Sequence, residues 1–456
     1  MDADRLPEIR PASAGIVQRT LTGRCDLLGL HARAPARYPF LLESAAGGGP
    51  RGRYDILFAF PGERVTLDRP GSLPGGFLKA LDARWQAERE PLDCALPFSG
   101  GWFLYLGYEL AGEIEPTLRL PPAKDGFPVA CATRVPAAIL YDAERDETHL
   151  MAEAGRAELL DALAADLAKG GRGPCAGGGP LLAAPIFEEP SARYLDGVRR
   201  IQDYIAAGDV FQVNLSRLWQ GQVLDSASPA EIYARLRRQN PAPFAGLVRF
   251  GTRAILSSSP ERLVERRGAL LQTRPIAGTR PRGKDGASDR GQTQNLLAHP
   301  KERAEHVMLI DLERNDLGRV AIPGSIVVDE FMSVESYAHV HHIVSNVRGE
   351  IRPETTPGEI IRAVFPGGTI TGCPKVRCME IVAELEETGR GPYTGAIGYL
   401  NRNGDLDLNI LIRSILCDGA QISIRAGAGI VADSVPAREL EETRDKARGM
   451  IRALTQ

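Results

Sequence analysis

Charged side chains in the second half of the chain stand where they could do chemistry. Glu305 precedes apolar residues by three, four and seven positions, so a helix would place this carboxylate on its apolar face. A buried carboxylate has to be paired, protonated or bound to a cation, and a salt bridge to an arginine is as open as a metal site. Glu442 and Lys446 are four residues apart, which on spacing alone indicates a surface ion pair.

Two glycine-rich segments resemble phosphate-binding motifs without matching them. Gly427 to Ala432 reads G-x-G-x-x-A, but a helix begins only after Pro436, so a dinucleotide site is not expected. In Pro366–Lys375, Cys-Pro follows the last glycine where a Walker motif has Lys-Ser/Thr. A glycine-rich turn before a helix still presents backbone N–H groups to an anion, although a plain tight turn is an equal reading.

The histidines and cysteines argue against a zinc site and a disulfide framework. In a strand, His339 and His341 would share one face and His342 the other, so the three cannot bind one metal ion. The seven cysteines are scattered and never spaced C-x-x-C, which is typical of reduced thiols and favours a cytoplasmic location. No apolar run approaches the ~18 residues of a membrane span, so no membrane partner is expected.

Alternating and helical patterns predict the elements that position these groups. Alternation predicts strands over Arg53–Phe60, Asp405–Arg413 and Gln421–Ala426, the second with Arg413 on its polar face. Prolines open predicted helices over Pro300–Leu317, Pro374–Thr388 and Pro436–Leu454. Strand hairpins with a few long helices indicate an α+β fold with large antiparallel sheets.

Composition indicates an enzyme-sized globular protein. The chain has 456 residues, 43% of them hydrophobic, and a formal net charge of -3, which argues against nucleic acid as the principal partner. The Gly/Pro-rich stretch around Lys169–Pro185 predicts a linker between an N-terminal and a C-terminal part.

Nine collinear motifs in the C-terminal part resemble the chorismate-utilising enzymes. Examples are FQVNLS at 211–216, SPER at 259–262, FPGGTITGCPKVRCME at 365–380, AGAGIVADS at 426–434 and EETRDK at 441–446. The resemblance implies that family's α/β sandwich. It divides the chain into an N-terminal subdomain (1–168), a linker or loop (169–188) and a chorismate-binding catalytic domain (189–456).

The resemblance also implies roles for individual residues. Glu305 and Glu442 are similar to the carboxylates that bind Mg²⁺, which is sensible for a hard cation and a dianionic substrate. Glu261 resembles the general acid that protonates the departing 4-hydroxyl, and His342 resembles the histidine against the ring. The implied substrate-binding residues are Thr369, Tyr393, Arg413, Gly427, Gly429 and Lys446.

The residue at position 212 indicates which nucleophile the resemblance implies. Isochorismate and salicylate synthases carry a water-activating lysine where this chain has Gln212, which points to ammonia. FPGGTITG, QVNLSR and HVHHIVS resemble aminodeoxychorismate synthase component I, which makes 4-amino-4-deoxychorismate for p-aminobenzoate and folate biosynthesis. PIAGT at 275–279 and the candidate tryptophan-site element Leu42, Glu43 and Ser44 resemble anthranilate synthase component I, the alternative.

Ala277 departs from the favoured branch. Known aminodeoxychorismate synthases have a lysine there that is thought to attack the ring, and an alanine cannot act as a nucleophile. Amination at C4 would then need direct addition of ammonia. A remote alternative is a catalytically idle chorismate-binding subunit, against which the complete set of catalytic carboxylates argues.

The source of ammonia predicts a partner protein. No cysteine lies in the glycine-flanked elbow that glutamine hydrolysis uses. Because NH₄⁺ has no lone pair, we expect a separate class I glutamine amidotransferase subunit to supply NH₃ to this chain.

Overall fold

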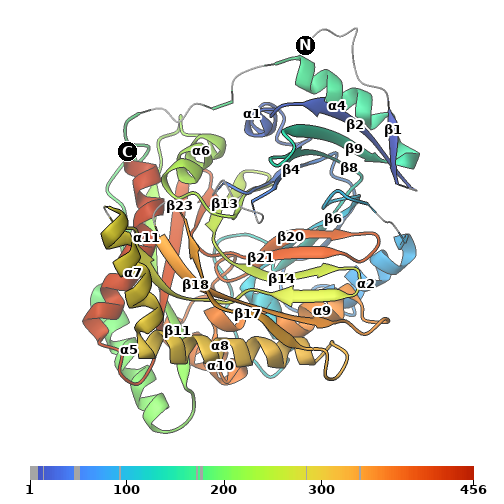
Figure 1. Cartoon of the computed structure of the whole chain (residues 1–456). Coiled ribbons are helices and arrows are strands. Elements are labelled where there is room, and N and C mark those ends of the chain that lie inside the picture. The colour runs from blue at the N-terminus through green and yellow to red at the C-terminus, as the bar shows by residue number, and fades with distance from the viewer. Residues whose placement is uncertain are drawn as a thin grey trace.

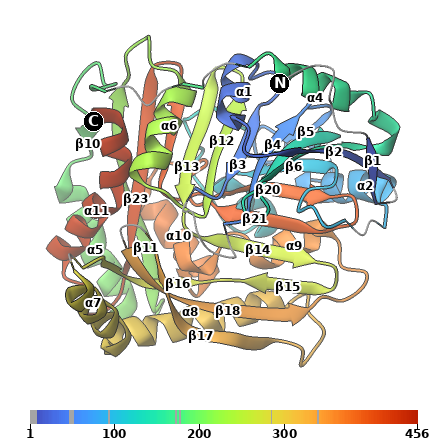
Figure 2. The ribbon, with the colours of Figure 1, turned by 45° about the horizontal axis from the view of Figure 1, so that its top comes forward.

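The computed structural model describes residues 9–13, 15–45, 52–91, 94–170, 173–174, 178–283, 285–337 and 340–456. Its described strands form two large sheets, and all the strand pairs of the described residues are antiparallel (Figures 1 and 2). The predicted α+β class with large antiparallel sheets is therefore confirmed.

Sheet A joins strands from both halves of the chain, because β3 of the N-terminal part pairs with β12 of the C-terminal part. In spatial order its strands are β1 (Arg10–Ser13), β2 (Ile16–Thr22), β9 (Glu147–Glu153), β8 (Ala137–Asp142), β4 (Tyr54–Ala59), β3 (Phe40–Glu43), β12 (Phe244–Phe250), β13 (Arg253–Ser259), β22 (Ser414–Asp418), β23 (Gln421–Ile430), β11 (Gln212–Gln222) and β10 (Phe187–Glu188), with β19 (Gly372–Cys373) on β11.

Sheet B is likewise continuous across the two halves, through the pairing of β6 with β20. Its strands are β16 (Ile276–Pro281), β18 (Val340–Glu350), β15 (Leu270–Thr273), β14 (Arg262–Arg267), β21 (Leu406–Ile410), β20 (Ala396–Asn401), β6 (Gly101–Leu106), β7 (Ala130–Val135) and β5 (Arg64–Leu67), with β17 (Val327–Ser336) on β18. The 169–188 stretch thus connects two parts whose strands share both sheets, and its role as a domain boundary stays a prediction.

Helices pack outside the sheets, while the inner faces of the two sheets meet in an aromatic core. Phe40 of sheet A stacks on Phe103 of sheet B with ring centroids 4.0 Å apart. The helices are α1 (Leu27–Arg33), α2 (Phe77–Glu88), α3 (Ala111–Ile114), α4 (Leu159–Ala168), α5 (Ser191–Ala206), α6 (Pro229–Gln239), α7 (Gly286–Ala298), α8 (Pro300–Gly318), α9 (Pro357–Val364), α10 (Lys375–Glu386) and α11 (Pro436–Thr455). No helix in the described ranges is long and apolar enough to cross a membrane.

Local signals explain where the helices near the site begin. Proline occupies the first turn of α8, α9 and α11, where its missing N–H leaves no hydrogen bond unmade. Thr356 and Glu359 form a capping box at α9. The three helices predicted from the sequence correspond to α8, α10 and α11, within two residues at each end.

Candidate active site

The first residue of β11, the inner side of α8 and the first half of α11 meet at one place. Gln212 Nε2 donates a hydrogen bond of 3.1 Å to Glu305 Oε1. Lys446 Nζ lies 2.6 Å from Glu442 Oε1 and donates to the Gly427 carbonyl at 3.0 Å. Residues that are distant in the sequence therefore form one cluster, as the site prediction requires.

Like charges dominate this cluster. Burial raises the pKa of Glu305, and the nearby carboxylates of Glu302 and Glu442 raise it further, while Lys446 and the Gln212 amide lower it. Carboxylates that repel one another on one side of a pocket are stabilised by a hard cation with oxygen ligands. Within the described residues no group of three or more metal-binding side chains is assembled.

The apolar spacing after Glu305 predicts that Glu302 lies on the opposite, exposed face of this helix, but the structure does not place it there. Its side chain is 18% exposed and pairs with Arg280 of β16 at 2.8 Å. The prediction is wrong because α8 packs against β16 and β18, which cover a wider arc of the helix than its apolar residues mark. Asp311, with a side chain 62% exposed, lies on the solvent face.

Two glycines of β23 keep the pocket open beside β11 and Tyr393. A Cβ at Gly429 would lie 2.3 Å from Gln212 Nε2, and one at Gly427 would lie 2.7 Å from Asn214 Oδ1 and 3.0 Å from the Tyr393 hydroxyl. The motif that resembled a dinucleotide loop is therefore an extended strand with close side-chain neighbours. A side chain at either glycine would collide with these neighbours, so both positions need a residue without a Cβ.

Two amide side chains point polar atoms into the interior without a protein partner. Gln212 and Asn214 are 3% and 8% exposed, and Gln212 Oε1 and Asn214 Oδ1 accept no hydrogen bond from any described residue. A buried polar atom left unpaired costs about 1–3 kcal/mol. Both oxygens are thus buried acceptors that no described residue satisfies.

Arg413 reaches the site from a loop and not from the polar face of a strand. The strand β21 ends at Ile410, earlier than the alternation predicts, and Arg413 has a left-handed φ of 54°. The predicted alternation does not continue to Arg413, because the chain leaves sheet B after Ile410 and begins β22 of sheet A at Ser414. Burial lowers the pKa of Arg413, while Tyr393 and Glu442 raise it, so both oxygens lie near the guanidinium.

Glu261 lies at the junction of β13 and β14 and is 5% exposed. Burial raises the pKa of its carboxyl to about 7, against smaller lowering effects of the Thr369 hydroxyl, the Ile276 N–H and the Lys446 charge. A carboxylic acid that titrates near neutral pH can donate a proton and be recharged by water. Thr369, in the short 3-10 turn Gly368–Ile370, lies near this carboxyl, and its buried hydroxyl has no hydrogen-bond partner among the described residues.

His342 lies on β18 across from β16, with Thr279 Oγ1 2.9 Å from its Nδ1. Burial, and then the charge of Arg413, lower its pKa to about 4, so the imidazole is neutral at neutral pH. The Tyr337 ring packs against it with centroids 5.8 Å apart. His341 points elsewhere, to Ser336 and Asp289, and His339 lies outside the described residues.

Ala277 lies on β16 opposite Ile343, close to this histidine, and is 6% exposed. A methyl group at this position offers no nucleophile.

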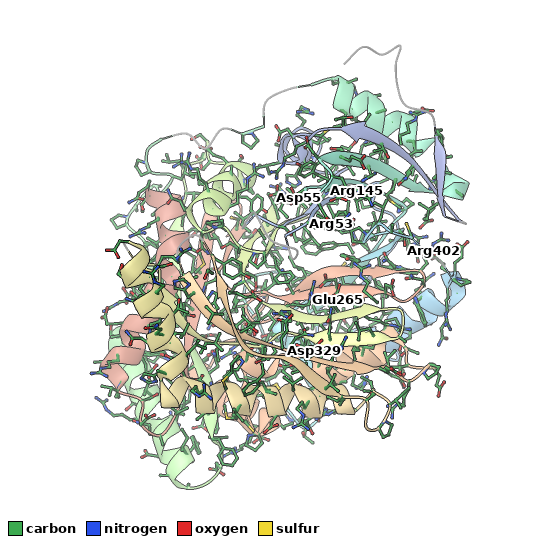
Figure 3. The ribbon with its side chains drawn as sticks, viewed as in Figure 1. Arg53, Asp55, Arg145, Glu265, Asp329 and Arg402 are labelled. Atoms are coloured by element: carbon green, nitrogen blue, oxygen red, sulfur yellow. The ribbon has the colours of Figure 1, made fainter. Side chains whose placement is uncertain are left out.

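A separate cavity of about 480 Å³ lies between the two sheets. Leu42, Glu43 and Ser44 line it from sheet A. Figure 3 labels Arg53 on the upper side of this space and Glu265 and Asp329 on the lower side, and all three line the cavity. Glu43 is buried and pairs with Arg237 at 2.6 Å. The candidate tryptophan-site element thus borders a ligand-sized space, and Glu261, Glu305 and Glu442 are not among the residues that line it.

Comparison with known proteins shows the family of this chain. Residues 40–452 match the family model described as chorismate binding enzyme. The chain belongs to the chorismate-binding enzymes.

Relatives within the chorismate-binding enzymes carry two different names. The chain is 53% identical over 272 residues to "Aminodeoxychorismate synthase component 1" of Bacillus subtilis, which covers 60% of this chain and 57% of that relative. It is 38% identical over 469 residues to "Anthranilate synthase component 1" of Thermus thermophilus, which covers 98% of both chains. The match to the first thus spans little more than half of that relative's length, whereas the match to the second spans nearly all of it.

Solved structures of the chorismate-binding family share the fold. Anthranilate synthase component I from Streptococcus pneumoniae superposes with a TM-score of 0.79 at 30% identity, over 89% of this chain and 93% of that one. MenF, an isochorismate synthase from Escherichia coli, superposes with a TM-score of 0.75 at 19% identity, covering 99% and 95%.

Several side chains around this candidate site are not singled out by the sequence. Asn214 shares a strand face with Gln212, and alternation alone could have found it. Thr279 was visible only as part of a motif, because its bond to His342 depends on the pairing of β16 with β18. Glu313, buried on α8, carries no sequence signal beyond helical periodicity.

Proposed function

We propose that this chain is an aminodeoxychorismate synthase component I, which converts chorismate and ammonia to 4-amino-4-deoxychorismate. The observation that carries the proposal is the convergence of Glu261, Glu305, Glu442 and Lys446 on one pocket beside Gln212. The 53% identity to the Bacillus subtilis relative supports this branch.

The second candidate is anthranilate synthase component I, in which ammonia enters elsewhere on the ring. Two observations favour it: the similarity to the Thermus thermophilus relative extends over 98% of both chains, and Ala277 replaces the expected lysine. Nothing in the pocket besides Ala277 separates the two products, because both reactions need the same acid and the same anchored ring carboxylate.

Glu305 and Glu442 are the residues that would hold Mg²⁺. Their mutual repulsion and the unpartnered Gln212 oxygen beside them fit a hard, oxygen-liganded cation. When bound, Mg²⁺ would neutralise and orient the ring carboxylate of chorismate. Lys446, Arg413 and the Tyr393 hydroxyl supply donors for the remaining carboxylate charge.

Glu261 would protonate the 4-hydroxyl as it departs, since its carboxyl is protonated below about pH 7. Neutral His342, oriented by Thr279, would lie against the ring without adding a charge. Gln212, unlike a lysine, cannot take a proton from water, which leaves ammonia as the better nucleophile in this pocket.

Incubation of the purified chain with chorismate, Mg²⁺ and ammonium salt at alkaline pH tests the proposal. Chromatography should show 4-amino-4-deoxychorismate, which the matching lyase converts to p-aminobenzoate, and no fluorescent anthranilate. Anthranilate as the main product would establish the second candidate. Chorismate left unconsumed would defeat both and favour an idle binding subunit.

Two further parts of the proposal concern supply and regulation. In cells, a separate class I glutamine amidotransferase would supply ammonia, consistent with the "component 1" names of the relatives.

The cavity bordered by Leu42, Glu43 and Ser44 would bind tryptophan, since it combines apolar walls with paired carboxylates and guanidinium groups.

A further inference from the structure

Glu313 is a buried carboxyl that the reaction described above does not use. It lies on the inner face of α8, two turns after Glu305, and is 4% exposed. A Cβ at Gly368 would lie 3.5 Å from Glu313 Oε1. Glu313 therefore lies beside the turn Gly368–Ile370, which carries Thr369, a residue that lies near Glu261.

The charges around Glu313 do not balance if it is ionised. Asp316, 1% exposed on the same helix, already pairs with Lys375 of α10 at 2.5 Å. No described cation lies within ion-pair distance of Glu313, so the buried space contains one lysine for two carboxyls. An unpaired carboxylate removed from water is costly, and such a group takes up a proton instead.

The groups that face Glu313 come from four elements. They are Asp316 on its own helix, Lys375 on α10, Glu261 at the β13–β14 junction and the Thr273 hydroxyl on β15, with Arg319 beyond Asp316. Thr273 Oγ1 also donates to the Leu263 carbonyl at 2.9 Å, two residues after Glu261. Burial raises the pKa of Glu313 to about 8, and the Asp316 and Glu261 charges act in the same direction.

We propose that Glu313 is a neutral carboxylic acid at neutral pH and a positioning residue that acts through Glu261, because the two buried carboxyls titrate as a coupled pair. This rests on the proposed function, in which Glu261 gives its proton to the departing hydroxyl and water leaves. Whichever of the two carboxyls ionises first raises the pKa of the other, because two negative charges in this buried space repel each other.

Infrared spectroscopy of the ligand-free protein tests the protonation without any turnover. At pH 7.5 the wild type should show a protonated-carboxyl C=O band that Glu313→Gln lacks, whereas Asp311→Asn, on the solvent face of the same helix, should keep it. A spectrum unchanged by Glu313→Gln would overturn the proposal.

The pH dependence of the melting temperature gives a second measurement of the proton on Glu313. The folded-state pKa of Glu313 is raised, so the wild type loses stability as the pH rises from about 4.5 toward about 8, because the unfolded chain releases a proton that the folded chain holds. Glu313→Gln should flatten this decline in melting temperature. Parallel wild-type and Glu313→Gln profiles would contradict a held proton.

The link to Glu261 has its own measurement. If the two carboxyls titrate as a pair, Glu261→Gln should lower the pH at which the Glu313 band disappears by about one unit. In turnover with ammonium, kcat of Glu313→Gln should start to fall at a lower pH than that of the wild type, with KM retained. An unshifted band or an unshifted kcat profile would overturn the link. If the wild type aminates no chorismate, the proposed function fails, while the band and its shift are still decided.

Discussion

Gln212 donates to Glu305 across the gap between β11 and α8, 3.1 Å from Nε2 to Oε1. The bond leaves Gln212 Oε1 directed into the pocket without a described partner. One amide thus orients a carboxylate that is proposed to bind metal and presents an acceptor beside it. Such outer contacts determine the orientation and basicity of a ligand as much as the ligand itself does.

Substitution of Glu305 or Glu442 should reduce activity far more than substitution of a carboxylate outside the proposed metal site. Glu305→Gln and Glu442→Gln retain size but remove charge beside the substrate carboxylate, so kcat/KM should fall on the order of 100-fold. Circular dichroism should show an intact fold. Asp311→Asn, exposed on the same helix as Glu305, is the matched control and should be nearly silent. Equal, mild effects at all three positions would make the carboxylates structural.

Glu302, which the helical pattern would have offered as a silent control, should instead show an effect. Glu302→Gln removes one of the charges that raise the Glu305 pKa and breaks the ion pair with Arg280. We expect Glu302→Gln to require a higher Mg²⁺ concentration for half-maximal activity than the wild type. The loss of Mg²⁺ affinity should be smaller than that of Glu305→Gln. A Mg²⁺ titration of activity gives this result, and indistinguishable titrations of Glu302→Gln and wild type would contradict it.

Gln212 should be needed for orientation and not for the fold. Gln212→Leu keeps the volume and removes both polar atoms, and we expect a loss of about 10–100-fold in activity, as for other partners of metal ligands. Gln222→Leu, at the exposed far end of the same strand, is the control. Equal activities of the two variants would show that the hydrogen bond to Glu305 has no role.

Regular patterns predicted the helices at the site because their apolar spacing and opening prolines are local properties. They misplaced Glu302 and Arg413, because the surroundings of both residues depend on strands that are distant in the sequence. Glu302 pairs with Arg280 of β16, and Arg413 lies where the chain passes from one sheet to the other before Ser414. Individual roles came from motif resemblance and not from spacing. The space beside Leu42–Ser44 could not be predicted, since it exists only where the two sheets face each other.

The pH dependence of the reaction rate should follow the protonation of the Glu261 carboxyl. Because its pKa is raised to about 7 and the acid form donates the proton, the rate per free NH₃ should fall as the pH rises through about 7. Rates have to be normalised to free NH₃, whose concentration rises with pH and would hide the decline. Glu261→Gln should abolish turnover while chorismate still binds, measured by calorimetry. A flat normalised profile would remove Glu261 as the acid.

The cavity between the sheets should bind tryptophan independently of the active site. Tryptophan should raise the melting temperature, because a ligand that binds only the folded state stabilises it. Ser44→Phe, which would fill the cavity, should abolish that shift, and Ser226→Phe on an exposed turn should not. A melting temperature that tryptophan leaves unchanged in the wild type would remove the tryptophan proposal without touching the active site.

Glutamine should be used only with a partner. The described cysteines are buried or half-buried, and burial raises the pKa of Cys25, Cys131, Cys373, Cys378 and Cys417, which is the opposite of an activated thiolate. The isolated chain should therefore turn over chorismate with ammonium salts and not with glutamine. Adding a class I glutamine amidotransferase should restore glutamine use, and a catalytic-cysteine variant of that partner should not. Because docking can be weak and dependent on substrate, turnover is a better measure than co-purification. Glutamine-dependent product from the chain alone would show that it contains a glutaminase site of its own.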